Sequence, residues 1–482
     1  MAKSGAGRRM YNPPLQGDRT IRASAPGVIM VAVLFAFLLA TLGGSSRYDM
    51  LQISILLPVS CLAAGYGLYR SWDADWSALK VPLILLMAWT GLTLLQVIPL
   101  PPGLWQALPG REPMAQIAGL LGDDRWRPLS MVPWRTQHAL WALSIPLAAL
   151  FVFAALRERA VEITVQAAIA FAVASALLGI LQVTLPSSDL LYFYAITNRG
   201  SPVGLFANEN HAAMFSAVML VVIAATMKIA PRPLAAWHMP ALGAAFFTLL
   251  VTQFINGSRA GLGLTVVALV ASALIALQGS GGGKASLRDG VRGLTKSPEA
   301  RIAAALFVGS IAIAVVFYFN DRLPALSDMV GQDVTADVRF KAAPILQQMT
   351  GIYFPFGSGF GSFETVYYIH EPSDLLSPVY LNQAHDDLLQ IIIEGGIFAV
   401  AIAAAALIWA GRLLWQLLRQ NDVQHRVIAF AGIGMIAIVL MASSVDYPLR
   451  VPLFQATAVW LVGMLAVLAK QPSWQGPENA RV

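Results

Sequence analysis

The sequence AHDDLLQIIIEGGIFAVAIAAAALIWAG, residues 384–411, joins a long polar segment to a long apolar run. The polar segment begins at Asp321 and is the longest break in an otherwise apolar chain. It contains Arg339 and a glycine-rich stretch, PFGSGFGSF, at residues 355–363. The apolar run is long enough to cross a bilayer, which takes roughly 20 residues, yet it carries Glu394. Ionisable residues beside and within a membrane span usually mark a functional site, and we expect the chemistry here.

The composition of the whole chain is that of a membrane protein. Its 482 residues are 57% hydrophobic and 12% charged, whereas a soluble domain carries about 25% charged residues. The net charge of +6 does not indicate nucleic-acid binding, because the basic residues sort by side of the membrane. The only cysteine, Cys61, lies in an apolar run, which excludes a disulfide framework and a cysteine-based metal site. We expect this thiol to be buried.

Apolar runs of the required length predict about 12 membrane-spanning helices. Their approximate ranges are 27–43, 51–69, 81–99, 137–156, 162–185, 211–229, 239–255, 260–278, 302–319, 388–411, 427–443 and 452–469. With the N-terminus inside, Lys and Arg concentrate in the cytoplasmic segments, as the positive-inside rule requires. We therefore predict an all-α polytopic membrane protein, whose parts are a membrane domain at residues 27–470, a large outer loop at residues 320–387, and cytoplasmic tails at residues 1–26 and 471–482.

Four segments on the outer side of this topology collect the unusual polar residues. In chain order they carry Arg199, Asn208, Asn210, His211, Arg259, Arg339, His385 and Glu394. Arginine suits phosphate because its guanidinium stays charged and presents a fixed fork of donors. Three arginines and a histidine on one side of the membrane therefore suggest an anionic, phosphate-like ligand.

Several of these residues also have a purely structural explanation, although Glu394, about two turns into an apolar helix, is harder to explain in this way. Asn208 and Asn210 can cap the helix that follows them, and Arg259 can extend from a helix end to the lipid headgroups. Acidic residues after His385 are favoured at a helix N-terminus by the helix dipole. The glycines at 357–361 either turn the backbone close to a ligand or form a plain turn.

A metal site at the start of the same span is a weaker interpretation. Asp386 and Asp387 could bind a divalent cation beside His385. Two adjacent carboxylates and one imidazole make a poor cation site without further ligands. We therefore predict no metal ion and no cofactor.

Three blocks of the sequence resemble the O-antigen ligase and polymerase superfamily. They are GLFANENH at residues 204–211, SRAG at 258–261, and residues 338–396 with the glycine-rich stretch, AHDDLLQ at 384–390 and Glu-Gly-Gly at 394–396. The similarity is strongest over roughly residues 165–400. The phrase PLSMVP, residues 128–133, is similar to exopolysaccharide members. Asp386 departs from the family pattern, in which asparagine often follows the histidine.

The resemblance implies a glycosyltransferase of the bacterial inner membrane with a multi-helix, GT-C-like architecture and both termini in the cytoplasm. Its donor would be a glycan on undecaprenyl pyrophosphate, presented at the periplasmic face. The acceptor would be a lipid A-core sugar in a ligase or a second lipid-linked glycan in a polymerase, and residues 128–133 favour the polymerase or exopolysaccharide type. Other polysaccharide-assembly proteins are further partners that the resemblance allows, and no metal ion is implied.

On this interpretation His385 is the expected catalytic base, with His211 as the second choice. The expected contacts to pyrophosphate or sugar are Arg199, Arg259, Arg339, Asn208, Asn210 and Glu394. Direct attack by the acceptor hydroxyl would invert the anomeric configuration. The alternative is a transporter or flippase of lipid-linked sugars, since such proteins also have many spans and charges that face a cavity. A peptidoglycan-type polymerase of related architecture is a further enzyme alternative.

Overall fold

The computed structural model describes residues 26–229, 237–278, 338–376 and 381–470. Within them, eight helices are long and apolar enough to cross a membrane, and three shorter apolar helices accompany them. Together they match every predicted span except 302–319, which lies outside the described residues. The prediction of an all-α polytopic membrane protein is therefore confirmed, while the total of 12 spans stays a prediction.

The bounds of these helices fall close to the predicted ranges. The long ones are α2 (Leu51–Ser71), α6 with α7 (Pro133–Ala142, Ser144–Ala155), α8 (Ala160–Thr184), α9 (Glu209–Ile229), α10 (His238–Ile255), α11 (Arg259–Ala276), α17 (Asp387–Leu418) and α18 (Val423–Ser443). The short ones are α1 (Pro26–Leu42), α3 (Lys80–Leu95) and α19 (Pro452–Leu468).

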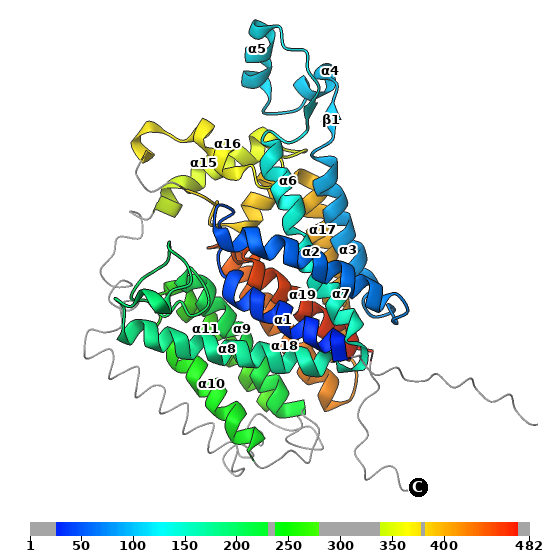
Figure 1. Ribbon diagram of the computed structural model, residues 1–482, viewed down its shortest axis with the longest axis vertical. Helices are drawn as coiled ribbons and strands as arrows, with labels where there is room; N and C mark the ends of the chain where they lie inside the picture. The colour runs from blue at the N-terminus through cyan, green and yellow to red at the C-terminus, as the bar shows by residue number, and fades with distance from the viewer. Residues whose placement is uncertain (1–25, 230–236, 279–337, 377–380, 471–482) are drawn as a thin grey trace, which may run out of the picture.

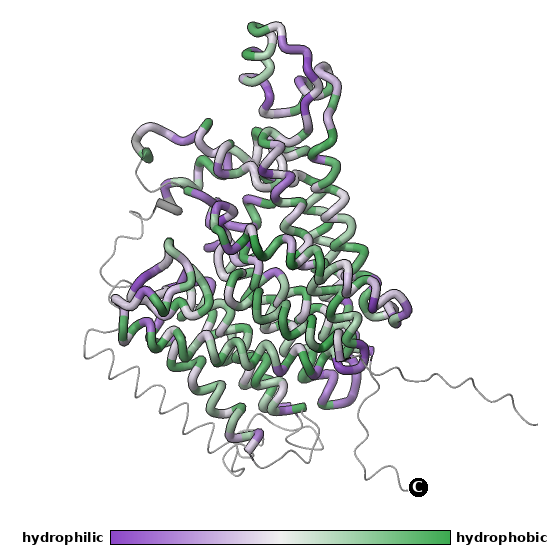
Figure 2. The backbone as a smooth tube through the Cα atoms, viewed as in Figure 1, coloured by the Kyte–Doolittle hydropathy of each residue, from purple (hydrophilic) through white to green (hydrophobic). Residues whose placement is uncertain are grey.

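Helix α9 is the centre of one half of the bundle. Its residues 211–223 are buried on every side, and α8, α10, α11 and α18 pack around it (Figure 1). A helix that is apolar all round has to lie inside the bundle. Helices at the periphery expose large apolar side chains, among them Val33 of α1 and Leu62 of α2, and the backbone tube in Figure 2 has the hydrophobic colour over much of the bundle.

The environment of the single cysteine differs from the prediction. Cys61 is exposed on α2, a helix that also exposes Leu62 and Tyr69. An apolar surface that faces lipid does not need to be covered by protein, so a thiol in an apolar run can lie there. The expectation of a buried thiol is therefore wrong.

Two groups of short elements lie beyond one end of the bundle (Figure 1). The first follows α3 and consists of β1 (Pro99–Leu100), α4 (Pro102–Gln106), α5 (Glu112–Leu121) and β2 (Arg127–Pro128), with β1 and β2 paired antiparallel. The second comes from the predicted outer loop and consists of α15 (Val338–Tyr353), α16 (Phe363–His370) and the turn η4 (Ser373–Leu375).

Arg111 joins these two groups. Its side chain is fully buried and donates hydrogen bonds to the carbonyl oxygens of Pro109, Leu129 and Gly357 at 2.7–2.8 Å. Burial lowers the pKa of its guanidinium to about 10, so the group still carries its charge at neutral pH. The segment after α3 is thereby fixed against the glycine-rich stretch.

Helix α17 is kinked at Gly396, where φ is 60° and ψ is −154°. At the kink the Ile397 N–H donates to the carbonyl oxygen of Pro355 at 2.8 Å, outside the helix. The N–H groups of Ser358 and Gly359 donate to the carbonyl oxygens of Ile393 and Glu394 at 2.8 and 2.9 Å. The glycine-rich stretch thus completes the hydrogen bonding of a broken membrane helix.

The glycines are required by this close contact between two backbones. A Cβ at Gly396 would lie 2.0 Å from the carbonyl oxygen of Pro355, and one at Gly357 would lie 2.4 Å from that of Glu394. Both residues have positive φ. The sequence left open a turn close to a ligand or a plain turn. The structure instead shows close approach of Gly357 to α17, of Gly359 to Ser130 and of Gly361 to Arg135, and these contacts account for the glycines without a ligand.

Replacing Gly396 with Ala should destabilise the protein by about 2 kcal/mol or more, because the new methyl meets backbone in a left-handed conformation. The midpoint of thermal unfolding in detergent measures this effect. Gly411→Ala is the matched control, since Gly411 lies in the same helix with nothing within 4 Å of its Cβ position. The expectation is refuted if the two variants unfold at the same temperature.

Candidate active site

The connection between α18 and α19 places a buried carboxylate between two histidines. Asp446 is 3% exposed and accepts hydrogen bonds from Asn210 Nδ2 at 2.7 Å and from the Tyr447 N–H at 2.9 Å. Its Oδ1 lies 3.4 Å from His385 Nδ1 and 3.6 Å from His211 Nε2. Segments from three parts of the chain therefore meet at one carboxylate.

His385 is held in a conformation that its neighbours enforce. Its φ is +51°, a left-handed value that is uncommon for a residue with a side chain. The next residue, Asp386, caps α17 by accepting a hydrogen bond from the Leu389 N–H at 2.9 Å. The ring of Tyr447 packs edge-on against both imidazoles, with centroid distances of 4.7 Å to His385 and 5.1 Å to His211. The imidazole of His385 is therefore fixed by local and distant contacts together.

Exposure distinguishes the two histidines. The side chain of His385 is 16% exposed and that of His211 is 3% exposed. A general base has to reach the proton that it removes. His385 can meet a substrate in this way, whereas His211 is enclosed between α9 and the connection that carries Asp446.

Asp446 is ionised in this environment. Burial raises the pKa of its carboxyl, but the imidazoles of His211 and His385 more than offset that effect and hold the pKa well below its ordinary value. A carboxylate beside an imidazole nitrogen orients the ring and stabilises its protonated form. Asp446 lies at ion-pair distance from His385 Nδ1, which makes no hydrogen bond with any of the described residues.

The two asparagines of the predicted site have different positions. Asn208 precedes α9, and its Oδ1 accepts a hydrogen bond from the Asn210 N–H at 2.8 Å, which is the capping arrangement. Asn210 uses its side chain to hold Asp446. Contacts of either residue with a sugar or phosphate stay predictions.

The three predicted arginines differ in how their charge is used. Arg199 pairs with Asp189 at 2.7 Å on the surface. Arg259 is the first residue of α11, and across the described ranges its guanidinium has neither an ion pair nor a hydrogen bond. Arg339 lies on α15, but its side chain is outside the part of the structure that is described.

Helix α11 brings Arg259 to the end of the bundle where α9 begins. Ser258 caps α11, and its Oγ accepts a hydrogen bond from the Gly261 N–H at 2.8 Å. Asn256, just before it, donates to the carbonyl oxygen of Glu209 at 3.0 Å. The unpaired guanidinium therefore begins a helix that is tied to the start of α9.

Sequence reasoning missed Asp446, Tyr447 and Arg450. They lie in the short connection of residues 444–451, which includes the turn η5 (Pro448–Arg450). The predicted topology puts this connection on the same side as the four outer segments, so charged residues in it were an available signal. The connection of residues 444–451 is short, and the candidate residues were instead sought in the longer polar segments.

Arg450 neutralises two carboxylates of α17. Its Nη1 donates to Glu394 Oε2 at 2.9 Å, and its Nε lies 3.3 Å from Asp387 Oδ1. Glu394 is fully buried, so the structure places this predicted ligand contact inside the protein. The carboxylate of Asp387 pairs with Arg450, and that of Asp386 caps α17. Among the described residues no group of three or more His, Cys, Asp or Glu is placed to hold a metal ion.

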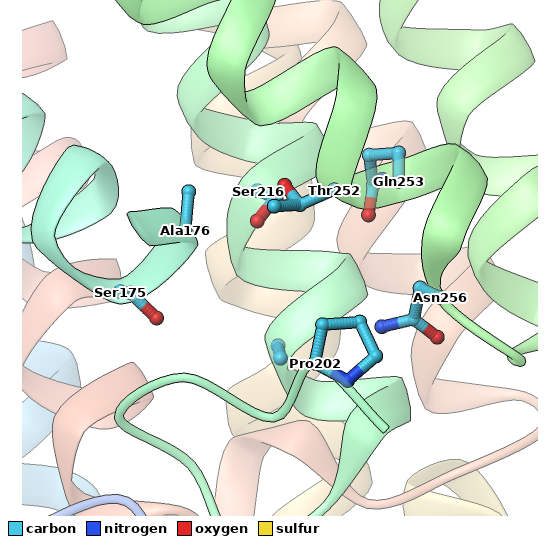
Figure 3. Close-up of a pocket in the computed structure, with 8 residues that line it drawn as sticks. Ser175, Ala176, Pro202, Ser216, Thr252, Gln253 and Asn256 are labelled. Atoms are coloured by element: carbon cyan, nitrogen blue, oxygen red, sulfur yellow. The ribbon is translucent and has the colours of Figure 1, made fainter. Parts of the chain in front are cut away.

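A small polar cavity lies behind the start of α9 (Figure 3). Its lining comes from α8, α9, α10 and the loop before α9, and includes Ser175, Ser216, Thr252, Gln253 and Asn256. Its volume of about 10 Å³ has room for roughly one water molecule. The cavity is too small to admit a sugar.

Replacing Arg450 with Gln should destabilise the protein by about 3 kcal/mol or more, because it leaves Glu394 and Asp387 buried without a counter-charge. Thermal unfolding in detergent measures the loss. Arg199→Gln, which breaks an exposed ion pair, should stay within about 1 kcal/mol of the wild type. Equal effects of the two substitutions would contradict the role given to the buried pair.

Comparison with known families agrees with the resemblance seen in the sequence. Residues 244–404 match the sequence model of the family described as O-Antigen ligase. The match contains Arg259, the glycine-rich stretch, His385 and Glu394, and it leaves out residues 204–211 and Asp446. No curated protein matches the chain. Residues 244–404 are therefore similar to the O-antigen ligase family, and they lie within a polytopic membrane protein.

Proposed function

We propose that this protein transfers or polymerises glycan from an undecaprenyl-pyrophosphate-linked donor at the periplasmic face of the inner membrane. The observation that carries the proposal is the meeting of His385 with the Asp446 carboxylate at the start of α17. An unpaired arginine, Arg259, begins α11 at the same end of the bundle. The reaction is an inverting displacement that uses no metal ion.

In this proposal the two nitrogens of His385 have different tasks. Nδ1 faces Asp446, so Nδ1 carries the hydrogen and Nε2 is left for the substrate. Nε2 takes the proton of the acceptor hydroxyl while the hydroxyl oxygen bonds to the anomeric carbon. The bond from that carbon to the pyrophosphate oxygen breaks, and the leaving group keeps the electron pair. Asp446 stabilises the imidazolium that results.

Charge balance selects the arginine that meets the pyrophosphate. Arg450 is neutralised by two carboxylates and Arg199 by one. No carboxylate among the described residues neutralises Arg259, and a preorganised cation stabilises the leaving group as its charge grows. Arg259 is therefore the principal phosphate contact, with Arg199 and Arg339 as further predicted contacts.

The transporter alternative is less well supported by the arrangement of the charges. A carrier of lipid-linked sugars needs polar groups along a route across the membrane. Here the contacts among Glu209, Asn256, Asp446 and His385 gather the site residues at one end of the bundle.

The nature of the acceptor rests on the sequence phrase at residues 128–133. In the structure this phrase packs on the glycine-rich stretch, because the Met131 N–H donates to the carbonyl oxygen of Ser358 at 2.9 Å. This packing gives residues 128–133 a structural role that does not depend on the acceptor. The choice of a second lipid-linked glycan as acceptor, as in a polymerase, stays a prediction.

Replacing His385 with Ala should lower glycan transfer by about 10²–10⁴-fold, the usual contribution of a general base. The assay uses proteoliposomes with purified lipid-linked donor, and mass spectrometry detects the new glycosidic bond. His238→Ala, at the opposite end of α10 from Asn256, is the control and should transfer at the wild-type rate. Undiminished transfer by His385→Ala, or movement of the lipid with an unchanged glycan, would overturn the proposal.

Replacing Arg259 with Ala should raise the KM for the donor by about 10-fold or more, because a charged hydrogen bond to phosphate is lost. Arg259→Lys should lie between Ala and wild type, since it keeps the charge without the fork. The rate at limiting donor measures both variants. Arg412→Ala, on the exposed far part of α17, is the control. A wild-type rate for Arg259→Ala at limiting donor would exclude Arg259 from phosphate binding.

A further inference from the structure

Gln390 is a fully buried polar residue of α17 that the proposed mechanism does not use. Its Oε1 accepts a hydrogen bond from the Ala384 N–H at 2.9 Å. Its Nε2 donates to Gln383 Oε1 at 2.7 Å and to Glu394 Oε1 at 3.3 Å. Every polar atom of this amide is engaged by the segment before α17 or by α17 itself.

The orientation of the Gln390 amide follows from its partners. The Ala384 N–H can only donate, so it requires the oxygen of the amide. The Glu394 carboxylate can only accept, so it requires the nitrogen. Glu394 is itself held by Arg450 Nη1 at 2.9 Å and by the Phe363 N–H at 3.1 Å. Turning the amide over would put oxygen against the carboxylate, and the carboxylate therefore selects one orientation.

This orientation acts directly on His385. Ala384 immediately precedes His385, and its N–H is the backbone group that Gln390 holds. Asp386 immediately follows His385 and caps α17. The left-handed conformation of His385 is thus fastened on both sides, by Gln390 before it and by the helix cap after it.

We propose that Gln390 is a positioning residue for His385 and that Glu394 and Arg450 act through it by fixing its amide. The inference rests on the proposed function, in which His385 is the base. Glu394 then serves the reaction from inside the protein, two contacts away from His385. A displacement of about 1 Å at a catalytic group can cost roughly 100-fold in rate, so the hold on Ala384 affects the chemical step.

The first test is Gln390→Met, which keeps the length of the side chain and removes all three hydrogen bonds of the amide. It should lower kcat by about 10- to 100-fold and leave the KM for the donor unchanged, because no donor contact is altered. Gln278→Met, two residues after the end of α11 and partly exposed, is the control. The assay is glycan transfer in proteoliposomes that contain the full-length protein.

The second test is Gln390→Glu, which still accepts from Ala384 but cannot donate to Glu394 while both groups are ionised. The surrounding titratable and charged groups are Asp387 and Glu394 of α17, Asp446 and Arg450 of the connection after α18, and His385. Transfer relative to wild type at each pH should rise as the pH is lowered, because a proton on either facing carboxyl restores the missing donor. Gln390→Met should show no such rise.

The third test exchanges donor and acceptor in the double variant Gln390→Glu with Glu394→Gln. The amide now at 394 can donate to the carboxylate at 390, which can accept from Ala384. Its oxygen can still accept from Arg450, but the Phe363 N–H loses its acceptor, so the expected recovery is partial. Transfer at neutral pH should exceed that of Gln390→Glu alone. This comparison, like the pH dependence, remains decisive if Gln390→Met does not fold.

The outcomes separate this inference from the proposed function. A wild-type kcat for Gln390→Met overturns the inference, and if His385→Ala is inactive the proposed function stands. A low but pH-independent relative activity of Gln390→Glu, without recovery in the double variant, overturns the inference and makes Gln390 a packing residue. Full activity of His385→Ala overturns the role of the base itself.

Discussion

A carboxylate that is removed from water must be paired, and this constraint shapes the whole site. Asp387, Glu394 and Asp446 are each at most 3% exposed. Two of them lie on one helix, and their shared counter-charge, Arg450, comes from the connection after α18. The third faces two imidazoles and an asparagine amide. An ion that is buried without partners costs several kcal/mol, so these contacts fix where α9, α17 and the α18–α19 connection lie relative to one another.

The kink in α17 is the second constraint. It lies next to Glu394, one of the buried carboxylates. A break in a membrane helix exposes carbonyl groups that lipid cannot satisfy. The glycine-rich stretch supplies the donors, and Gln96 adds a further hydrogen bond to the carbonyl oxygen of Glu394 at 3.0 Å. The side chain of Glu394 meanwhile binds Arg450. Glu394 therefore links the two constraints: its carbonyl oxygen accepts hydrogen bonds at the kink, and its carboxylate pairs with Arg450.

The arrangement separates the tasks of residues that look alike in sequence. Of the two histidines beside Asp446, only His385 has an accessible side chain. The arginines differ in the number of carboxylates that neutralise them, and this number decides whether a guanidinium is available to an anion. Structural and chemical roles are thus set by partners more than by residue type.

The sequence by itself determined the membrane class, the candidacy of His385 and Arg259, and the bounds of the described spans to within a few residues, except that α17 continues to Leu418, beyond the predicted end at residue 411. Apolar runs report span positions directly, because bilayer thickness sets their length. Only the tertiary structure decided that Glu394 is enclosed and that Asp446 and Arg450 belong to the site. These roles depend on contacts between residues far apart in the chain, such as Asn210 with Asp446, 236 positions apart, and Gln96 with Glu394, 298 positions apart. Pairing at such distances follows from how the helices pack. The two residues that govern His385 most closely, Gln390 and Asp446, show the same division: Gln390 lies within a motif visible in the sequence, whereas Asp446 meets His385 only in the folded chain.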